Sequence, residues 1–211
     1  RGCKLAAVSE KPEAAAAVSF EGEVLAVKAR IRLLRSFDET SHNYQGYTLV
    51  LRGVVDGVAL DRFKVAIGPA AQEKHQLRRF DRLAGKAAPV QNRETEWADY
   101  YKASALRVLS CGPDSEKRPA DPDGGLAPPL PDYRARGHRR LDPTTCETAC
   151  AACSFGLVMP TEITLDKRTR ETTWRFETHC YGPRDCPRYV AVPPYRVPGR
   201  DPGREWIDDE G

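Results

Sequence analysis

The cysteines in the last third of the chain form the pattern with the clearest chemical meaning. Cys150 and Cys153 are separated by two residues, and a second pair, Cys180 and Cys186, follows after a further stretch of chain. Two close pairs of thiolates can saturate one tetrahedral ion, most often zinc. The spacing therefore predicts a closed, structural metal site with the ligands Cys150, Cys153, Cys180 and Cys186.

Cys146 offers a different reading of the same segment. The spacing Cys146-x3-Cys150-x2-Cys153 matches the one that holds an iron–sulfur cluster in radical SAM enzymes. Too little chain follows Cys153 for the partial α/β barrel of those enzymes. Ala152 also stands where they usually have an aromatic residue. Cys146 therefore stays as an alternate ligand, and a plain iron–sulfur cluster stays as the alternative to zinc.

The other cysteines and the histidines give weaker signals. Unliganded thiols or a disulfide are the alternative to any metal site, and Cys3 and Cys111 are isolated in the sequence. His179 could replace a thiolate, although a residue next to Cys180 in a strand normally points the other way. His42 and His138 are expected to be surface residues without partners.

The segment between the two cysteine pairs reads as a β-hairpin. Strands are expected over 160–165 and 172–178, with a turn between them and one apolar face. That face is expected to carry Ile163, Leu165, Trp174 and Phe176. A knuckle, a hairpin and a second knuckle predict a zinc-ribbon-like module over 145–190. So small a module needs metal ligation to fold.

The part of the chain before this module reads as a small barrel. Alternating apolar and polar residues predict strands over 20–35, 47–55, 62–67, 83–90 and 97–109. Asp56-Gly57 is a hairpin signal, and a short helix is expected over 70–77. Three strands, a helix and two strands is the order of the five-stranded OB-fold barrel. We therefore predict a mainly β protein with an OB-fold barrel over 19–110, the alternative being an unspecified β-sandwich.

The remaining segments are expected to lie outside any core. We predict a disordered leader over 1–18, a Pro/Gly-rich linker with a basic segment over 111–144, and a disordered tail over 191–211. No apolar run has the length of about 20 residues that spans a bilayer. The net charge of +3 does not by itself demand a nucleic-acid partner. A cytoplasmic protein without a membrane contact is expected.

Basic and aromatic residues could form a surface for single-stranded nucleic acid. Cations alternate along the first strand and continue on the third, and OB-folds bind single strands through a basic groove with stacking aromatics. An ordinary solvated strand face is the alternative. The candidate contacts are Lys28, Arg30, Arg32, Phe37, Tyr44, Tyr47, Arg62, Lys64, Tyr101, Arg136, Arg139 and Arg140.

Four segments carry a resemblance to a known group of proteins. They are Arg32-Leu-Leu-Arg-Ser-Phe-Asp38, Ala98-Asp-Tyr-Tyr-Lys102, Tyr133-Arg-Ala-Arg-Gly-His-Arg-Arg140 and Phe176-Glu-Thr-His-Cys-Tyr-Gly-Pro183. Over about 20–190 the chain resembles prokaryotic OB-fold proteins of uncharacterised function with a C-terminal cysteine module. The resemblance implies a fold and a metal site but no activity. Acyl-CoA-associated proteins also join a ribbon to an OB-fold, but there the ribbon precedes the barrel.

No catalytic motif accompanies these features. The sequence contains no nucleophile elbow, P-loop, dinucleotide fingerprint or HExxH. The first hypothesis is therefore a non-enzymatic protein that binds single-stranded RNA or DNA and has a structural zinc site. The alternatives are an accessory subunit that binds another protein, and an iron–sulfur protein.

Overall fold

The structure is a computed structural model that describes residues 16–36, 40–113, 125–166 and 168–192. Phe37, most of the predicted leader and most of the predicted tail lie outside these ranges. The described part is mainly β, as predicted, with eight strands in one mixed sheet and three short helices. Among the described residues, no helix has the length and apolar character to cross a membrane.

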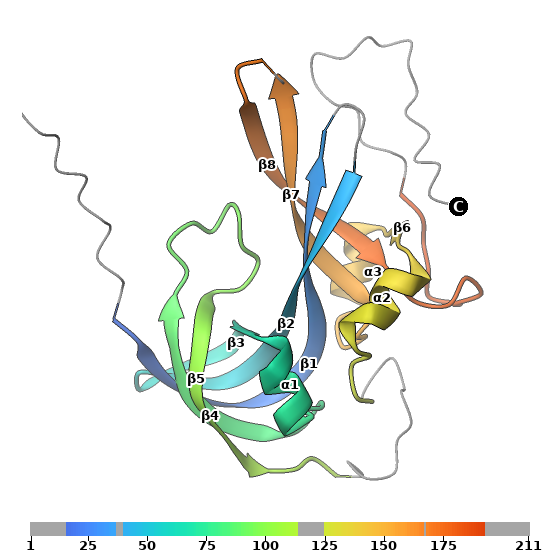
Figure 1. Cartoon of the computed structure of the whole chain (residues 1–211). Coiled ribbons are helices and arrows are strands. Elements are labelled where there is room, and N and C mark those ends of the chain that lie inside the picture. The colour runs from blue at the N-terminus through green and yellow to red at the C-terminus, as the bar shows by residue number, and fades with distance from the viewer. Residues whose placement is uncertain (1–15, 37–39, 114–124, 167, 193–211) are drawn as a thin grey trace, which may run out of the picture.

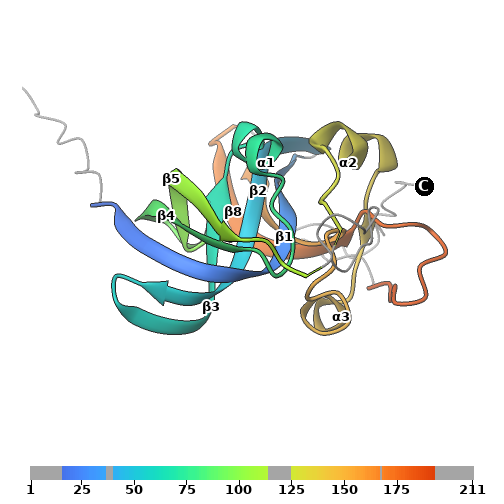
Figure 2. The same ribbon diagram turned by 90° about the horizontal axis from the view of Figure 1, so that it is seen from below.

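Five strands close into a ring in the first half of the chain (Figure 2). Within the ring each strand pairs with two others, in the circular order β1–β2–β3–β5–β4–β1. The pairing between β3 and β5 is short and parallel. The strands are β1 (Val18–Arg35), β2 (Thr40–Val55), β3 (Val58–Ile67), β4 (Arg82–Pro89) and β5 (Tyr100–Ser110).

The sequence signals that predicted these strands are present in the structure. On β1, Val27, Ala29, Ile31 and Leu33 are all buried. Asp56 and Gly57 have φ angles of 45° and 82°, as the turn of a two-residue hairpin requires. Helix α1 (Pro69–His75) lies between β3 and β4 as expected. The second strand was predicted over 47–55, but β2 begins earlier, at Thr40.

The long β1–β2 pair leaves the ring and forms an arm (Figure 1). A register shift between Arg30 and Ile31 marks the bend, and Gly46 lies opposite it with a φ of 131°. A Cβ on Gly46 would lie 2.3 Å from the carbonyl oxygen of Ile67. Only glycine fits this close approach with this backbone conformation.

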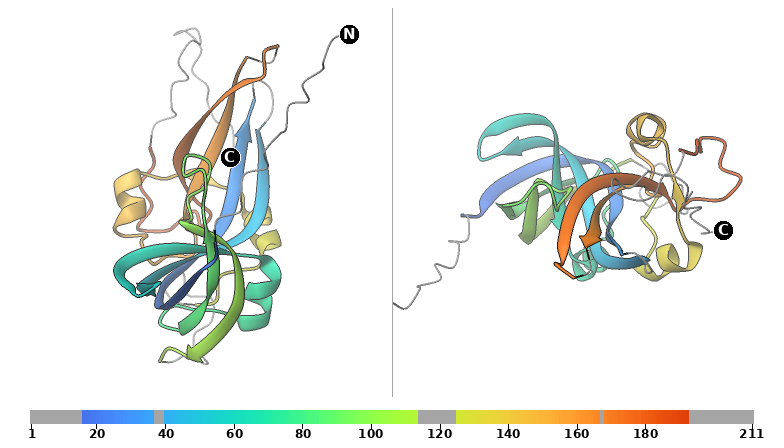
Figure 3. Two further views of the ribbon diagram at one scale, coloured as in Figure 1. Left: turned by 90° about the vertical axis from the view of Figure 1, so that its left-hand side faces the viewer. Right: turned by 90° about the horizontal axis from the view of Figure 1, so that it is seen from above.

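The predicted C-terminal hairpin completes the arm (Figure 3). It consists of β7 (Gly156–Asp166) and β8 (Glu171–Cys180), and a short strand β6 (Arg139–Arg140) pairs with the end of β8. β7 pairs in parallel with the end of β1, where Leu33 lies opposite Thr161. The hairpin thus extends the sheet of the ring.

The side-chain face predicted for this hairpin is wrong. Trp174 pairs with Glu162 and Phe176 pairs with Pro160, so both rings lie on the face opposite Ile163. The buried face of the hairpin contains Leu157, Met159, Ile163, Glu177 and His179.

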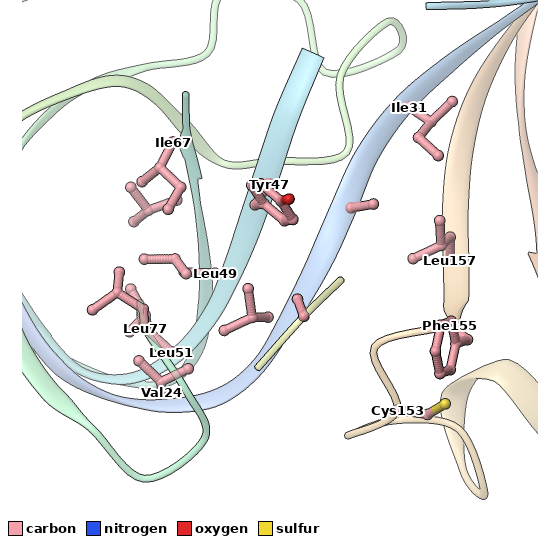
Figure 4. Packing of buried hydrophobic residues seen from close by; sticks show 14 of the residues in the cluster. Val24, Ile31, Tyr47, Leu49, Leu51, Ile67, Leu77, Cys153, Phe155 and Leu157 are labelled. Carbon is pink, nitrogen blue, oxygen red and sulfur yellow. The ribbon is translucent and has the colours of Figure 1, made fainter. Parts of the chain in front are cut away.

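The segment predicted as a linker contributes to the core instead. Helix α2 (Leu130–Arg136) buries Tyr133 completely, and the phenol donates a hydrogen bond to the carbonyl oxygen of Ser154. Helix α3 (Pro143–Glu147) is capped by Asp142 and carries Cys146. Figure 4 shows that β1 runs between the apolar side chains of the ring and those around Cys153, which form one cluster.

Candidate functional site

Backbone amides donate hydrogen bonds to two sulfurs of the cysteine segment. The backbone N–H groups of Phe155 and Gly156 donate to the sulfur of Cys153. After β8, the N–H group of Gly182 donates to the sulfur of Cys180 at 3.3 Å. Such amides stabilise a thiolate, and they commonly donate to the sulfur ligands of a bound metal ion.

Gly156 permits this geometry because of its size. A Cβ at this position would lie 2.8 Å from the Cβ of Cys150 and 3.7 Å from its sulfur. The first residue of β7 thus approaches Cys150 closely.

Four cysteines are neighbours in the structure. Cys146, Cys150, Cys153 and Cys180 are all buried, and each interacts electrostatically with the other three. They come from α3, from the loop before β7 and from the end of β8. Burial and the neighbouring thiols raise the pKa of Cys150 to about 11. Burial likewise raises the pKa values of Cys146 and Cys153.

Cys186, a predicted ligand, is placed differently. It lies half-exposed in the loop after β8, and its backbone N–H group donates to the carbonyl oxygen of Pro183. Within the described ranges, no side-chain contact or electrostatic interaction joins Cys186 to the four buried cysteines. The structure thus groups Cys146, and not Cys186, with Cys150, Cys153 and Cys180.

Lys28 lies beneath this group and not on the surface. Its side chain is 2% exposed, and the ammonium donates to the carbonyl oxygens of Cys150, Cys153 and Gly156 at 3.0, 2.9 and 2.5 Å. Burial lowers the pKa of Lys28, and the nearby cysteines raise it. No carboxylate among the described residues forms an ion pair with it. Lys28 is therefore unavailable as a contact for nucleic acid.

The possible ligand side chains that the structure describes do not have the spacing of a metal site. No three His, Cys, Asp or Glu side chains in the described part of the chain lie close enough together to hold an ion. The donor chemistry nevertheless fits a soft cation, because four buried thiols are neighbours and the sulfurs of Cys153 and Cys180 accept hydrogen bonds from backbone amides.

Cationic and aromatic side chains meet on the outer face of the arm. The guanidinium of Arg32 lies over the ring of Trp174, 5.1 Å from its centre, and donates to the carbonyl oxygen of Thr95. Arg30 forms an ion pair with Glu96 in the loop before β5. Phe176 is 40% exposed and follows Trp174 on the same face of β8. We call Arg30, Arg32, Trp174 and Phe176 the outer face.

A second cation lies over a tryptophan at the edge of the ring. The ammonium of Lys64 is 5.3 Å from the ring centre of Trp97 and 3.5 Å from a carboxylate oxygen of Asp99. Trp97 belongs to the same loop as Thr95 and Glu96, which contact the outer face. The loop before β5 therefore connects Lys64 to Arg30 and Arg32.

The other predicted contacts are scattered or buried. Tyr47 is buried, and its phenol donates to the carbonyl oxygen of Pro128. Arg140 is 10% exposed beside Glu177, while Arg62 is exposed on β3 and Tyr101 lies under Lys102. The remaining three, Tyr44, Arg136 and Arg139, line a pocket next to α2. The predicted contacts thus do not form one surface.

The histidines form a cluster that sequence reasoning missed. The ring of His138 lies 4.3 Å from that of His42 and 4.9 Å from that of His179, measured between ring centres. His179 is fully buried and faces this cluster, away from the cysteines, as strand alternation predicted. Burial lowers its pKa well below the ordinary value, and His138 adds to this effect. These residues are far apart in the sequence, so no local signal could have joined them.

Comparison with known proteins adds no neighbour to these observations. No protein-family model, no curated protein and no solved structure matches the chain.

Proposed function

We propose that the protein is a non-enzymatic binding protein for single-stranded RNA or DNA, stabilised by a metal ion held between cysteine thiolates. The observation that carries this proposal is the outer face. There Arg32 covers Trp174, and Phe176 exposes a second aromatic ring beside it. Stacked bases and a phosphate backbone need such a combination of aromatic rings and guanidinium groups.

The arrangement of the ring supports this proposal. Its five strands form a ring, with a helix between the third and fourth strands, which is the arrangement that the proposed OB-fold would need. In OB-folds the loop between the fourth and fifth strands takes part in binding. Here that loop contributes Glu96, Thr95 and Trp97 beside Arg30, Arg32 and Lys64.

The four buried cysteines support the metal part of the proposal. The ligands we propose are Cys146, Cys150, Cys153 and Cys180, with Cys186 as the alternative from sequence spacing. Four thiolates around a divalent ion carry a net negative charge, and a buried ammonium such as that of Lys28 needs a negative neighbour. The acidic groups that raise the pKa of Lys28 are Cys146, Cys153 and Cys150, which metal binding would hold as thiolates. Zinc and an iron–sulfur cluster both fit four thiolates.

A binding titration with variants of the outer face tests the function. Trp174→Ala and Phe176→Ala are expected to weaken the binding of a fluorescently labelled single-stranded oligonucleotide by about 1–3 kcal/mol for each lost stack. Arg32→Gln should reduce the salt dependence of the affinity, because one phosphate contact is lost. Fluorescence anisotropy at several salt concentrations measures both effects.

Phe80→Ala is the matched control. Phe80 is 37% exposed and lies under Arg79 in the loop before β4, so the substitution removes a similar pair elsewhere on the surface. It should leave the affinity unchanged. Absence of binding to RNA and DNA at low salt would reject the proposal. Copurification of a defined protein that Trp174→Ala releases would identify the outer face as a protein-binding surface instead.

A further inference from the structure

A second candidate site lies on the opposite face of the arm. A cavity of about 500 Å³ is formed by α2 and the residues after it, the start of β2 and the loop after β8. Because His42 pairs with Leu33, it lies on the other face of the sheet from Arg32. The cavity is therefore separate from the outer face.

The lining of this cavity is strongly basic. Its ionisable side chains are those of four arginines, two histidines, one tyrosine and one cysteine, and no aspartate or glutamate is among them. The arginines are Arg134, Arg136, Arg139 and Arg184, and the histidines are His42 and His138. Four guanidinium groups around one small cavity produce a positive potential that a multiply charged anion can balance.

The neighbouring arginines share one buried carboxylate. The buried carboxylate of Glu177 pairs with Arg175 at 2.6 Å, with Arg35 at 3.2 Å and with Arg140 at 3.9 Å. By contrast, no carboxylate among the described residues forms an ion pair with an arginine of the cavity. Among the described residues, the arginines of the cavity thus keep their positive charge without a carboxylate partner.

Three of the four arginines of the cavity are held in place without losing their charge. Arg134 lies over the ring of Tyr44 and Arg136 over that of Phe155, at 4.9 and 5.0 Å from the ring centres. Arg139 donates to the carbonyl oxygens of Pro183 and Arg184 at 2.7 and 3.0 Å. Guanidinium groups fixed in this way lose little side-chain entropy when they bind an anion.

We propose that this cavity binds a small phosphorylated molecule with at least two phosphate groups. Arginine pairs well with phosphate oxygens through two parallel hydrogen bonds, and four arginines exceed the need of a single phosphate. The volume is within the range of small-molecule sites, and the cavity has a second wall of hydroxyl groups in Thr40 and Ser41.

Isothermal titration calorimetry with inorganic pyrophosphate tests this site on the full chain. Wild-type protein is expected to bind pyrophosphate at least tenfold more tightly than inorganic phosphate. Arg134→Gln combined with Arg136→Gln should weaken pyrophosphate binding at least tenfold. The matched control combines Arg52→Gln with Arg82→Gln, which removes two exposed arginines of the ring. It should leave the affinity for pyrophosphate unchanged. Arg184→Gln tests the cavity separately and should also weaken pyrophosphate binding. Its side chain forms no hydrogen bond or ion pair among the described residues, so the substitution removes no contact that holds the fold.

The outcomes separate this site from the proposed function. Pyrophosphate binding that is lost in the cavity variants but retained in Trp174→Ala supports the proposal, whatever happens to oligonucleotide binding. Absence of pyrophosphate binding in the wild type, or wild-type affinity for pyrophosphate in both Arg184→Gln and the double variant, overturns it. If the cavity variants lose oligonucleotide affinity and pyrophosphate competes with the strand, the cavity binds the backbone of a nucleic acid and the proposal of a small ligand is wrong.

Discussion

Lys28 shows how far a single residue can depart from its local pattern. It alternates with apolar residues on β1 and so reads as a solvated side chain. In the structure the ammonium is buried and satisfies three carbonyl oxygens of the cysteine segment. Nothing in the period-two pattern could predict this, because the covering segment comes more than 100 residues later in the chain. Lys28 thus attaches the knuckle to the ring.

Replacing Lys28 tests this role. In Lys28→Met three buried carbonyl oxygens lose their donor, and we expect the free energy of unfolding to fall by about 1–3 kcal/mol. Urea denaturation followed by tryptophan fluorescence measures the change. Lys86→Met removes an exposed lysine from β4 and is the control. Equal stability of the two variants would contradict the role of Lys28.

At the scale of elements, the strands of the ring were predictable and the hairpin face was not. The alternation on β1 and the Asp56-Gly57 turn are local signals, and both led to the observed elements. The face of Trp174 depends on how β8 aligns with β7. That alignment depends on the end of the hairpin, where the pairing shifts register between Thr164 and Asp166. A slip of one residue moves every side chain to the other face.

Helix α2 was not predicted at all, because the proline and glycine content of its segment suggested a linker. Pro131 falls in the first turn of the helix, where proline is well tolerated, and Gly137 follows the last residue. Tyr133 then anchors the helix on the cysteine segment through Ser154. Burial raises the pKa of this phenol well above its ordinary value.

The raised pKa of Tyr133 predicts a loss of stability at alkaline pH. Because the folded-state pKa is the higher one, this contribution is complete below pH 10 and is lost as the pH rises above it, by at most about 1.4 kcal/mol per pH unit. Tyr133→Phe should be less stable at pH 8 by about 1 kcal/mol, since a hydrogen bond is lost. Its stability should then fall less steeply above pH 10.

Urea midpoints at pH 8, 10 and 11 measure both effects. Tyr47 also has a raised pKa because of burial, so some alkaline loss should remain in Tyr133→Phe. Parallel curves of stability against pH for the wild type and the variant would show that the pKa of Tyr133 is not raised in the folded protein.

At the scale of the whole molecule, the ring and the cysteine segment share one core. The parallel pairing of β7 with β1, the burial of Tyr133 and the hydrogen bonds of Lys28 all join them. The sequence suggested a barrel and a separate module, because each half has its own local signals. Pairings between distant segments leave no such signal, so the union of the two halves and the position of Cys186 apart from the four buried cysteines became visible only in the structure.

The central claim is that one metal centre holds the four buried cysteines together. Elemental analysis of the purified protein, with absorbance near 400 nm to separate zinc from an iron–sulfur cluster, tests it directly. We predict bound zinc or iron in the wild type and in Cys186→Ser, and loss of most of that metal in Cys146→Ser. Wild-type protein without bound metal, or metal that depends on Cys186 and not on Cys146, would contradict the claim.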